Sequence, residues 1–405
     1  MPRAGWSKPV SDRRLSDLVS VGVLMRTFPP ALVDEVVAEA GRTEQRNRSL
    51  PARVMAYFAI GMALHSEGSY EDVLSLLADG LAWAAESEPL VLPSKSAIFQ
   101  ARVRLGSAPV EALFRRVAEP LAAPGSSGCW LAGRRLVAID GMCVDVADTP
   151  DNDAWFGRER VNTDGRATLP QARVVALAEC GTHVMFDAAV GRSTTAENTL
   201  ALELIDRLQP GMLLLADRGF CEFPLLARAA ATGADLLWRA IGNIEARHLQ
   251  TLGDGTWLAE MRPGSNTGRT LAPVTIRVID DQLDGGRLDD TTHRLFTTML
   301  DPIEAPAVDL AVAAAQQWEI ERTFDELKFH QRGAHTVLRS KSPELVIQEI
   351  WGHLCCHYAI RTLMWESADQ SRIDPDRSSS VAALRTTHRS TSAAADHHSK
   401  PDQSN

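Results

Sequence analysis

Two short apolar runs, each closed by an aspartate, place the strongest constraint on how this chain can fold. Residues 136–139 are followed by Asp140 and a glycine, and residues 212–216 are followed by Asp217. Such a run is typical of a buried strand whose last side chain lies at the edge of a sheet. A lone aspartate in this setting is more often a turn former or a helix N-cap. Together, the two runs predict two buried strands that each end in a carboxylate.

A third acidic segment lies in the last quarter of the chain. Ile320, Phe324 and Leu327 recur at helical spacing and predict the apolar stripe of a helix. Beside this stripe, Glu321 and Lys328 lie about two turns apart. An amphipathic surface helix would explain this segment alone. With the two aspartates, however, it supplies the three carboxylates that a pair of divalent cations needs, because magnesium prefers oxygen ligands and keeps positions open for phosphate.

The three acidic segments, taken in order, resemble the motifs of a known enzyme family. They lie in residues 139–141, 216–220 and 318–328. Together they resemble the DDE transposases of the insertion-sequence-four type, and the likeness runs from about residue 20 to Arg361. The resemblance implies an α/β fold, in which a ribonuclease-H-like mixed sheet is flanked by helices and carries a β-rich insertion behind an all-helical N-terminal domain.

The resemblance also implies the chemistry of the site. Asp140, Asp217 and Glu321 would be the catalytic triad and would bind two Mg²⁺ or Mn²⁺ ions when DNA is bound. Lys328 would neutralise a DNA phosphate beside them. The expected partners are the terminal inverted repeats of a transposon and a target DNA, with the protein acting as a dimer.

The third motif departs from the family at two positions. Family members have a tyrosine and an arginine there that help to hold DNA phosphate, whereas this chain has Ala314 and Gln317. We therefore expect the wild-type chain to be a weak transposase. In the variant Ala314→Tyr with Gln317→Arg, both new side chains should reach the DNA without disturbing the core.

The pattern along the chain predicts its domain organisation. We expect a flexible N-terminus (1–20), a helical DNA-binding domain (21–121), a linker (122–128), a catalytic domain (129–365) with an insertion at about 225–305, and a disordered tail (366–405). Within the catalytic domain the patterns predict a β-hairpin (173–179 with 183–190), a helix (195–208) and strands at 235–240, 256–259, 274–279 and 294–300.

Two features of these domains are candidate DNA contacts. Lys95, Arg102 and Arg104 lie on a short predicted helix that resembles a recognition helix, although an ordinary bundle helix is an equally good explanation. Family members also stack an aromatic residue of the insertion on a displaced base. Trp238 and Trp257 are candidates for that role, with a buried core position as the alternative for each.

Charge and composition narrow the remaining possibilities. A net charge of −10 argues against a protein that simply coats DNA, but it leaves room for a local basic groove. The six cysteines show no metal-site spacing, and the sequence shows neither a membrane span nor a signal peptide, so we expect a cytoplasmic, nucleoid-associated protein. The alternatives to a transposase are a DNA-binding protein without efficient catalysis and a metal-dependent hydrolase of small phosphoesters.

Overall fold

The computed structural model describes most of the chain, namely residues 22–46, 50–64, 68–75, 77, 93–158, 169–240, 246–263, 271–281, 293–315, 320, 323–324 and 337–371. Its helices are α2 (Pro30–Glu39), α3 (Ala52–Leu64), α5 (Lys95–Leu105), α6 (Ala108–Val117), α7 (Pro150–Phe156), α8 (Glu197–Leu204), α9 (Phe223–Ala231), α10 (Ala307–Ala315) and α12 (Pro343–Ser371), with 3₁₀ turns η1 (Ile205–Arg207) and η2 (Arg218–Phe220). Its strands are β1 (Trp130–Leu131), β2 (Arg134–Asp145), β3 (Gln171–Glu179), β4 (Met185–Arg192), β5 (Met212–Ala216), β6 (Asp235–Ala240), β7 (Ala246–Thr251), β8 (Trp257–Met261), β9 (Val274–Asp281) and β10 (His293–Thr297).

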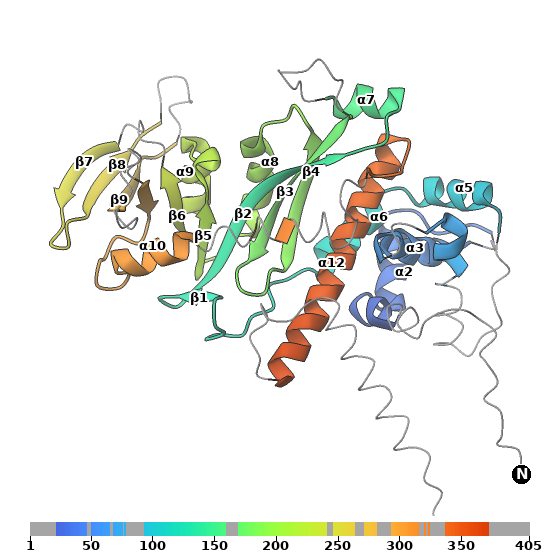
Figure 1. Ribbon diagram of the computed structural model, residues 1–405, viewed down its shortest axis with the longest axis horizontal. Coiled ribbons are helices and arrows are strands. Elements are labelled where there is room, and N and C mark those ends of the chain that lie inside the picture. Colours follow the sequence, from blue (N-terminus) through green and yellow to red (C-terminus); the bar gives the residue numbers. More distant parts are fainter. Residues whose placement is uncertain are drawn as a thin grey trace, which may run out of the picture.

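One ten-stranded sheet forms the centre of the molecule (Figure 1). Nine of its strands follow the order β4-β3-β2-β5-β6-β10-β9-β8-β7, and β1 pairs with β2 beside this path. Strands β2, β3 and β4 are antiparallel, and β5 and β6 then join β2 in parallel. Helices α8 and α9 make the connections into β5 and β6, as parallel pairing requires. This arrangement of five strands is the ribonuclease-H-like core, and it confirms the predicted mixed sheet flanked by helices.

Most of the elements predicted for the catalytic domain are present. Strands β3 and β4 form the expected hairpin, and α8 with η1 occupies the expected helix. The insertion, however, starts later than residue 225. Strand β6 pairs in parallel with β5, so α9 and β6 belong to the core, and only β7–β10 extend the sheet beyond it as antiparallel strands.

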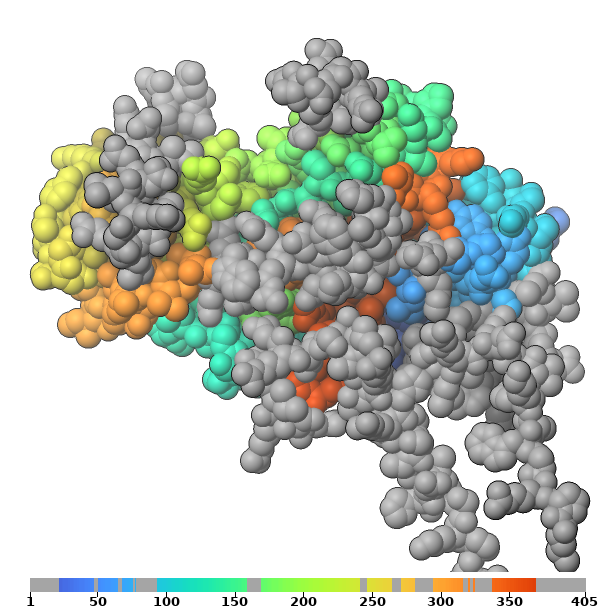
Figure 2. Space-filling model, viewed as in Figure 1, coloured from blue at the N-terminus to red at the C-terminus, as the bar shows by residue number. Residues whose placement is uncertain are grey.

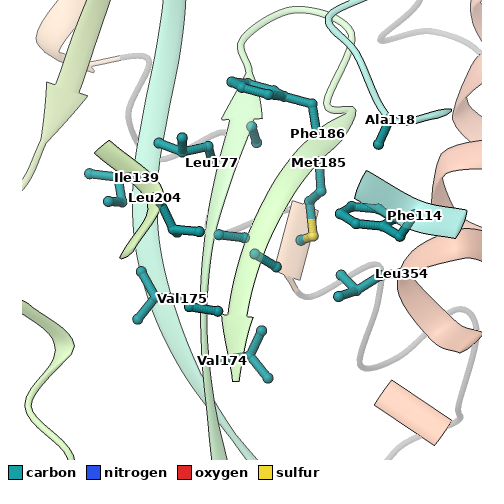
Figure 3. Packing of buried hydrophobic residues seen from close by; sticks show 14 of the residues in the cluster. Phe114, Ala118, Ile139, Val174, Val175, Leu177, Met185, Phe186, Leu204 and Leu354 are labelled. Atoms are coloured by element: carbon teal, nitrogen blue, oxygen red, sulfur yellow. The ribbon is translucent and has the colours of Figure 1, made fainter. Parts of the chain in front are cut away.

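The N-terminal helices pack directly on the catalytic domain through α12. Figure 1 shows α12 running between the sheet and the helices α2 and α3. Phe114 of α6, Met185 of β4 and Leu354 of α12 point toward one another in a shared core (Figure 3), and all three are buried. The helical region and the catalytic sheet therefore pack against each other in one continuous core.

The predicted linker begins as an anchored segment. The backbone N–H groups of Leu121 and Ala122 donate hydrogen bonds of 2.9 and 3.0 Å to the carboxylate of Glu179, which is fully buried at the end of β3. Arg135 pairs with the same carboxylate. The start of the predicted linker, residues 122–128, is therefore fixed to the sheet.

The chain ends differ slightly from the prediction. Helix α12 continues to Ser371, so the first six residues of the expected tail, 366–371, are helical. Residues 1–20 and the rest of the expected tail lie outside the described residues. In the described part of the chain, no helix is long and apolar enough to cross a membrane.

The contact between α12 and α3 gives a test of the shared core. The Gly352 Cα lies so close to α3 that a methyl group added there would overlap the carbonyl of Ala59. We expect Gly352→Ala to lower the free energy of unfolding by about 1–3 kcal/mol, because overpacking outweighs the higher helix propensity of alanine. Urea unfolding measures the change. Gly22→Ala is the matched control, since Gly22 is also helical but has open space around it. Equal stability of both variants would show that the two helices separate easily.

Candidate active site

The sheet register brings Asp140 and Asp217 together. Parallel pairing of β2 with β5 ends at the partners Ile139 and Ala216. Asp140 directly follows Ile139, and Asp217 directly follows Ala216. Asp217 retains an extended backbone, with φ −77° and ψ 177°. The two side chains therefore leave the same face of the sheet at neighbouring positions.

Asp140 does not end its strand as the sequence suggested. Strand β2 has 12 residues and continues to Asp145, because its other edge pairs with β3 from Val137 to Asp145, including Asp140 with Ala176. Asp140 instead marks the point where β2 and β5 part. Asp140 therefore follows the end of the β2–β5 pairing, and not the end of strand β2.

Each aspartate is held by a backbone amide close to it in sequence. Asp217 Oδ1 accepts a 2.8 Å hydrogen bond from Gly219 and so caps η2, which means that the helix-cap interpretation is also correct. Asp140 Oδ1 accepts a 2.8 Å hydrogen bond from Gly141. Both aspartates are half-buried. They form a pair of oriented carboxylates, the hard oxygen donors that suit a magnesium-sized cation.

The other two predicted catalytic residues, Glu321 and Lys328, lie outside the described residues. Within the described part, no three acidic, histidine or cysteine side chains gather as a metal site. Of the predicted apolar stripe, Ile320 and Phe324 are each 2% exposed, in agreement with the pattern. Two of the three predicted triad members are thus brought together by the described structure.

Chain segments on both sides of the third motif are attached to the sheet. Before it, α10 packs against β6. After it, Leu338 forms a parallel bridge with Val146, just beyond the end of β2. Ala314 on α10 is only 5% exposed. The expectation that a tyrosine at 314 would reach DNA without disturbing the core is therefore wrong, because its ring would have to enter packed space.

Of the three candidate DNA contacts on α5, two are on the surface. Ser94 caps the helix and Gly106 ends it. Lys95 and Arg104 are exposed, and the ammonium of Lys95 lies 3.8 Å from the carboxylate of Glu71.

Arg102 is fully buried, which corrects its assignment as a DNA contact. Its guanidinium donates hydrogen bonds to Gln348 (2.9 Å), to the hydroxyl of Tyr70 (2.6 Å) and to Ser340 (3.0 Å). Burial lowers the pKa of Arg102, while the neighbouring Tyr70 and Glu349 oppose that shift. This side chain ties the N-terminal helices to the region around α12.

The two tryptophan candidates also differ in exposure. Trp238 on β6 is fully buried, as the core alternative predicted. Trp257 on β8 is half-buried, with the ring of His248 stacked at 5.3 Å and the guanidinium of Arg294 at 5.7 Å from its centroid.

Figure 2 shows that the insertion strands and the N-terminal helices form opposite ends of the described surface.

No sequence pattern singled out Glu197 and Asn198, although both contact the aspartate-bearing segments. Asn198 Nδ2 donates a 3.0 Å hydrogen bond to the carbonyl of Gly219, and the Glu197 carboxyl lies against Gly141. The available signal was weak, since these residues only begin the helix that follows the hairpin.

Comparison with known proteins identifies the family of this chain. The family model described as "Insertion element 4 transposase N-terminal" matches residues 18–115, and the one described as "Transposase DDE domain" matches residues 131–359. The chain is 31% identical over 344 residues to "Transposase InsG for insertion sequence element IS4" of Escherichia coli (strain K12), covering 84% of this chain and 76% of that one. It is 28% identical over 230 residues to "Putative transposase InsZ" of the same organism, covering 56% of this chain and 74% of the other.

Among solved structures, a piggyBac transposase in a synaptic complex with hairpin DNA aligns with a TM-score of 0.45 and 10% identity, over 94% of this chain and 82% of that one. The DDE domain match implies a divalent metal cofactor and DNA as the partner. On the family matches and the identity to the IS4 enzyme, this chain belongs to the DDE transposases of the insertion-sequence-four type.

Proposed function

We propose that this transposase cuts the terminal inverted repeats of its insertion sequence and joins the freed 3′ ends to target DNA, using Asp140, Asp217 and Glu321 to hold two Mg²⁺ ions. The observation that carries the proposal is the register of β2 and β5, because it sets two carboxylates side by side on one face. Bound divalent ions supply charge neutralisation at the phosphate and lower the pKa of an attacking water.

The protein side of the reaction is positioning. Asp140 and Asp217 are oriented before DNA arrives, since each already accepts a hydrogen bond from a backbone amide. Phosphoryl transfer needs little covalent chemistry from side chains, so fixed geometry and charge account for most of the acceleration. In this proposal Glu321 would complete the metal site and Lys328 would neutralise the phosphate, as the third acidic motif implies.

The DNA partner would be held outside the metal site as well. Lys95 and Arg104 offer two exposed cations on α5, and we assign them to DNA phosphate near the transposon end. Action as a dimer on the two ends, on chromosomal DNA of the nucleoid, completes the proposal.

One observation favours the second candidate, a DNA-binding protein without efficient catalysis. Ala314 occupies the family's tyrosine position and is buried, so this position offers no hydroxyl to DNA phosphate. A low rate of cleavage would follow from that loss even if the metal site is complete.

The deciding experiment incubates the full chain with linear DNA that carries the ends of its own insertion sequence. We expect end-specific cleavage with Mg²⁺ or Mn²⁺, and DNA binding alone when EDTA is present. Binding without cleavage at any metal concentration would support the second candidate. Hydrolysis of a small phosphoester without binding of DNA would contradict both.

A further inference from the structure

The start of α8 contacts the backbone of both aspartate-bearing segments. Successive side chains of a strand point to opposite faces of the sheet, so Asp140 and the position of Gly141 face opposite ways. A methyl group added at Gly141 would lie 2.7 Å from Glu197 Oε1 and 3.0 Å from its Cγ. Glu197 therefore packs on the back of β2, directly behind Asp140, and only a glycine at 141 allows this approach.

The neighbouring residue makes the equivalent contact with the second segment. Asn198 Nδ2 donates a 3.0 Å hydrogen bond to the carbonyl of Gly219, and the amide of Gly219 donates a 2.8 Å hydrogen bond to Asp217 Oδ1. Asn198 and Asp217 thus bond to the same residue. A shift of the η2 turn would change both bonds together.

The bonding of Asn198 is hard to explain by stability alone. Its Oδ1 atom is buried and accepts no hydrogen bond from the described residues. A buried polar atom without a partner destabilises a fold. The one side-chain hydrogen bond described for Asn198 is to the η2 turn, so an apolar residue of similar size would fill the site without that cost.

We propose that Glu197 and Asn198 are positioning residues that hold Asp140 and Asp217 at their metal-binding separation from the opposite face of the sheet. The inference rests on the proposed metal-dependent function. The guanidinium of Arg173 on β3 lies 3.7 Å from Glu197 Oε1. Neither residue would touch the cation or the DNA. They act through Gly141 and Gly219, much as outer-shell partners orient metal ligands in other sites.

The first test replaces Asn198 by leucine, which keeps the volume and removes the hydrogen bond. We expect cleavage of the transposon ends at saturating DNA to slow about tenfold, and the Mg²⁺ concentration for half-maximal rate to rise severalfold, with DNA affinity unchanged. Asn198→Gln retains an amide donor and should restore part of both effects. Glu203→Gln is the matched control, since Glu203 is an exposed residue of the same helix, and it should leave both unchanged.

A second readout does not depend on activity. Hydrogen exchange of the backbone amides in residues 218–221 should accelerate in Asn198→Leu and stay as in the wild type in Glu203→Gln. Gly141→Ala should displace Glu197 and raise the half-maximal Mg²⁺ concentration in the same way. Unchanged exchange in 218–221, or slower cleavage with unchanged metal dependence, would overturn the inference. If the wild type does not cleave the transposon ends, the proposed function is wrong. The hydrogen exchange of residues 218–221 would still test whether Asn198 holds the η2 turn in place.

Discussion

Asp217→Asn is expected to reduce metal-dependent cleavage of the transposon ends by at least about a thousandfold while the protein stays folded. Loss of a carboxylate that holds a catalytic cation removes several kcal/mol of charge stabilisation, and about 4 kcal/mol corresponds to three orders of magnitude in rate. Asparagine keeps the Oδ1 acceptor that bonds to Gly219, so the cap of η2 survives. Asp140→Asn and Glu321→Gln should behave in the same way.

The measurement is a cleavage time course, with DNA binding followed separately by gel shift. Binding should be largely retained, because the metal ligands are not the groups expected to recognise the transposon end. Asp151→Asn is the matched control, since Asp151 is exposed in the first turn of α7 and away from the register of β2 and β5. A variant of Asp217 that cleaves at the wild-type rate, or one that loses binding and cleavage equally, would contradict the assignment.

The pairing of the two aspartates could be predicted from the sequence only in part. Local patterns identify Asp140 and Asp217 as polar residues that follow apolar runs. Whether they meet depends on the register of β2 against β5, which is set by packing on both faces and by the length of the crossover. For the same reason the sequence could not show that β2 continues past Asp140, because its pairing with β3 decides where the strand ends.

The start of the insertion could not be predicted for the same reason, because it too depends on how the strands pair. The apolar run of β6 resembles those of β9 and β10, so composition does not separate core strands from inserted ones. The distinction lies in direction. Strand β6 follows a helix and runs parallel to β5, whereas β10 runs antiparallel to β6.

The case of Arg102 shows why burial of a charge escapes a local pattern. Lys95, Arg102 and Arg104 look alike in sequence, as basic residues on one short helix. The partners that distinguish Arg102 are Gln348 and Ser340, which lie more than two hundred positions later in the chain. Nothing within α5 indicates that these residues will cover it.

We therefore expect Arg102→Ala to lower the free energy of unfolding by about 3–5 kcal/mol, the usual cost of removing one partner from a buried charged network. The acceptors on Gln348, Tyr70 and Ser340 would lose their donor, and Glu349, which is 5% exposed, would lose a neighbouring positive charge. Urea unfolding of the full chain measures the loss.

Arg104→Ala separates this structural role from DNA binding, because it removes an exposed arginine two residues away on the same helix. Its stability should stay within about 0.5 kcal/mol of the wild type. If Arg104 contacts a phosphate, its loss weakens DNA binding and reduces the slope of log affinity against log salt by about one. Arg102→Ala, measured where it remains folded, should keep the wild-type slope, since a buried guanidinium releases no counterion on binding. A stable Arg102→Ala protein with a reduced slope would mean that α5 opens on DNA and that the sequence-based assignment of Arg102 was right.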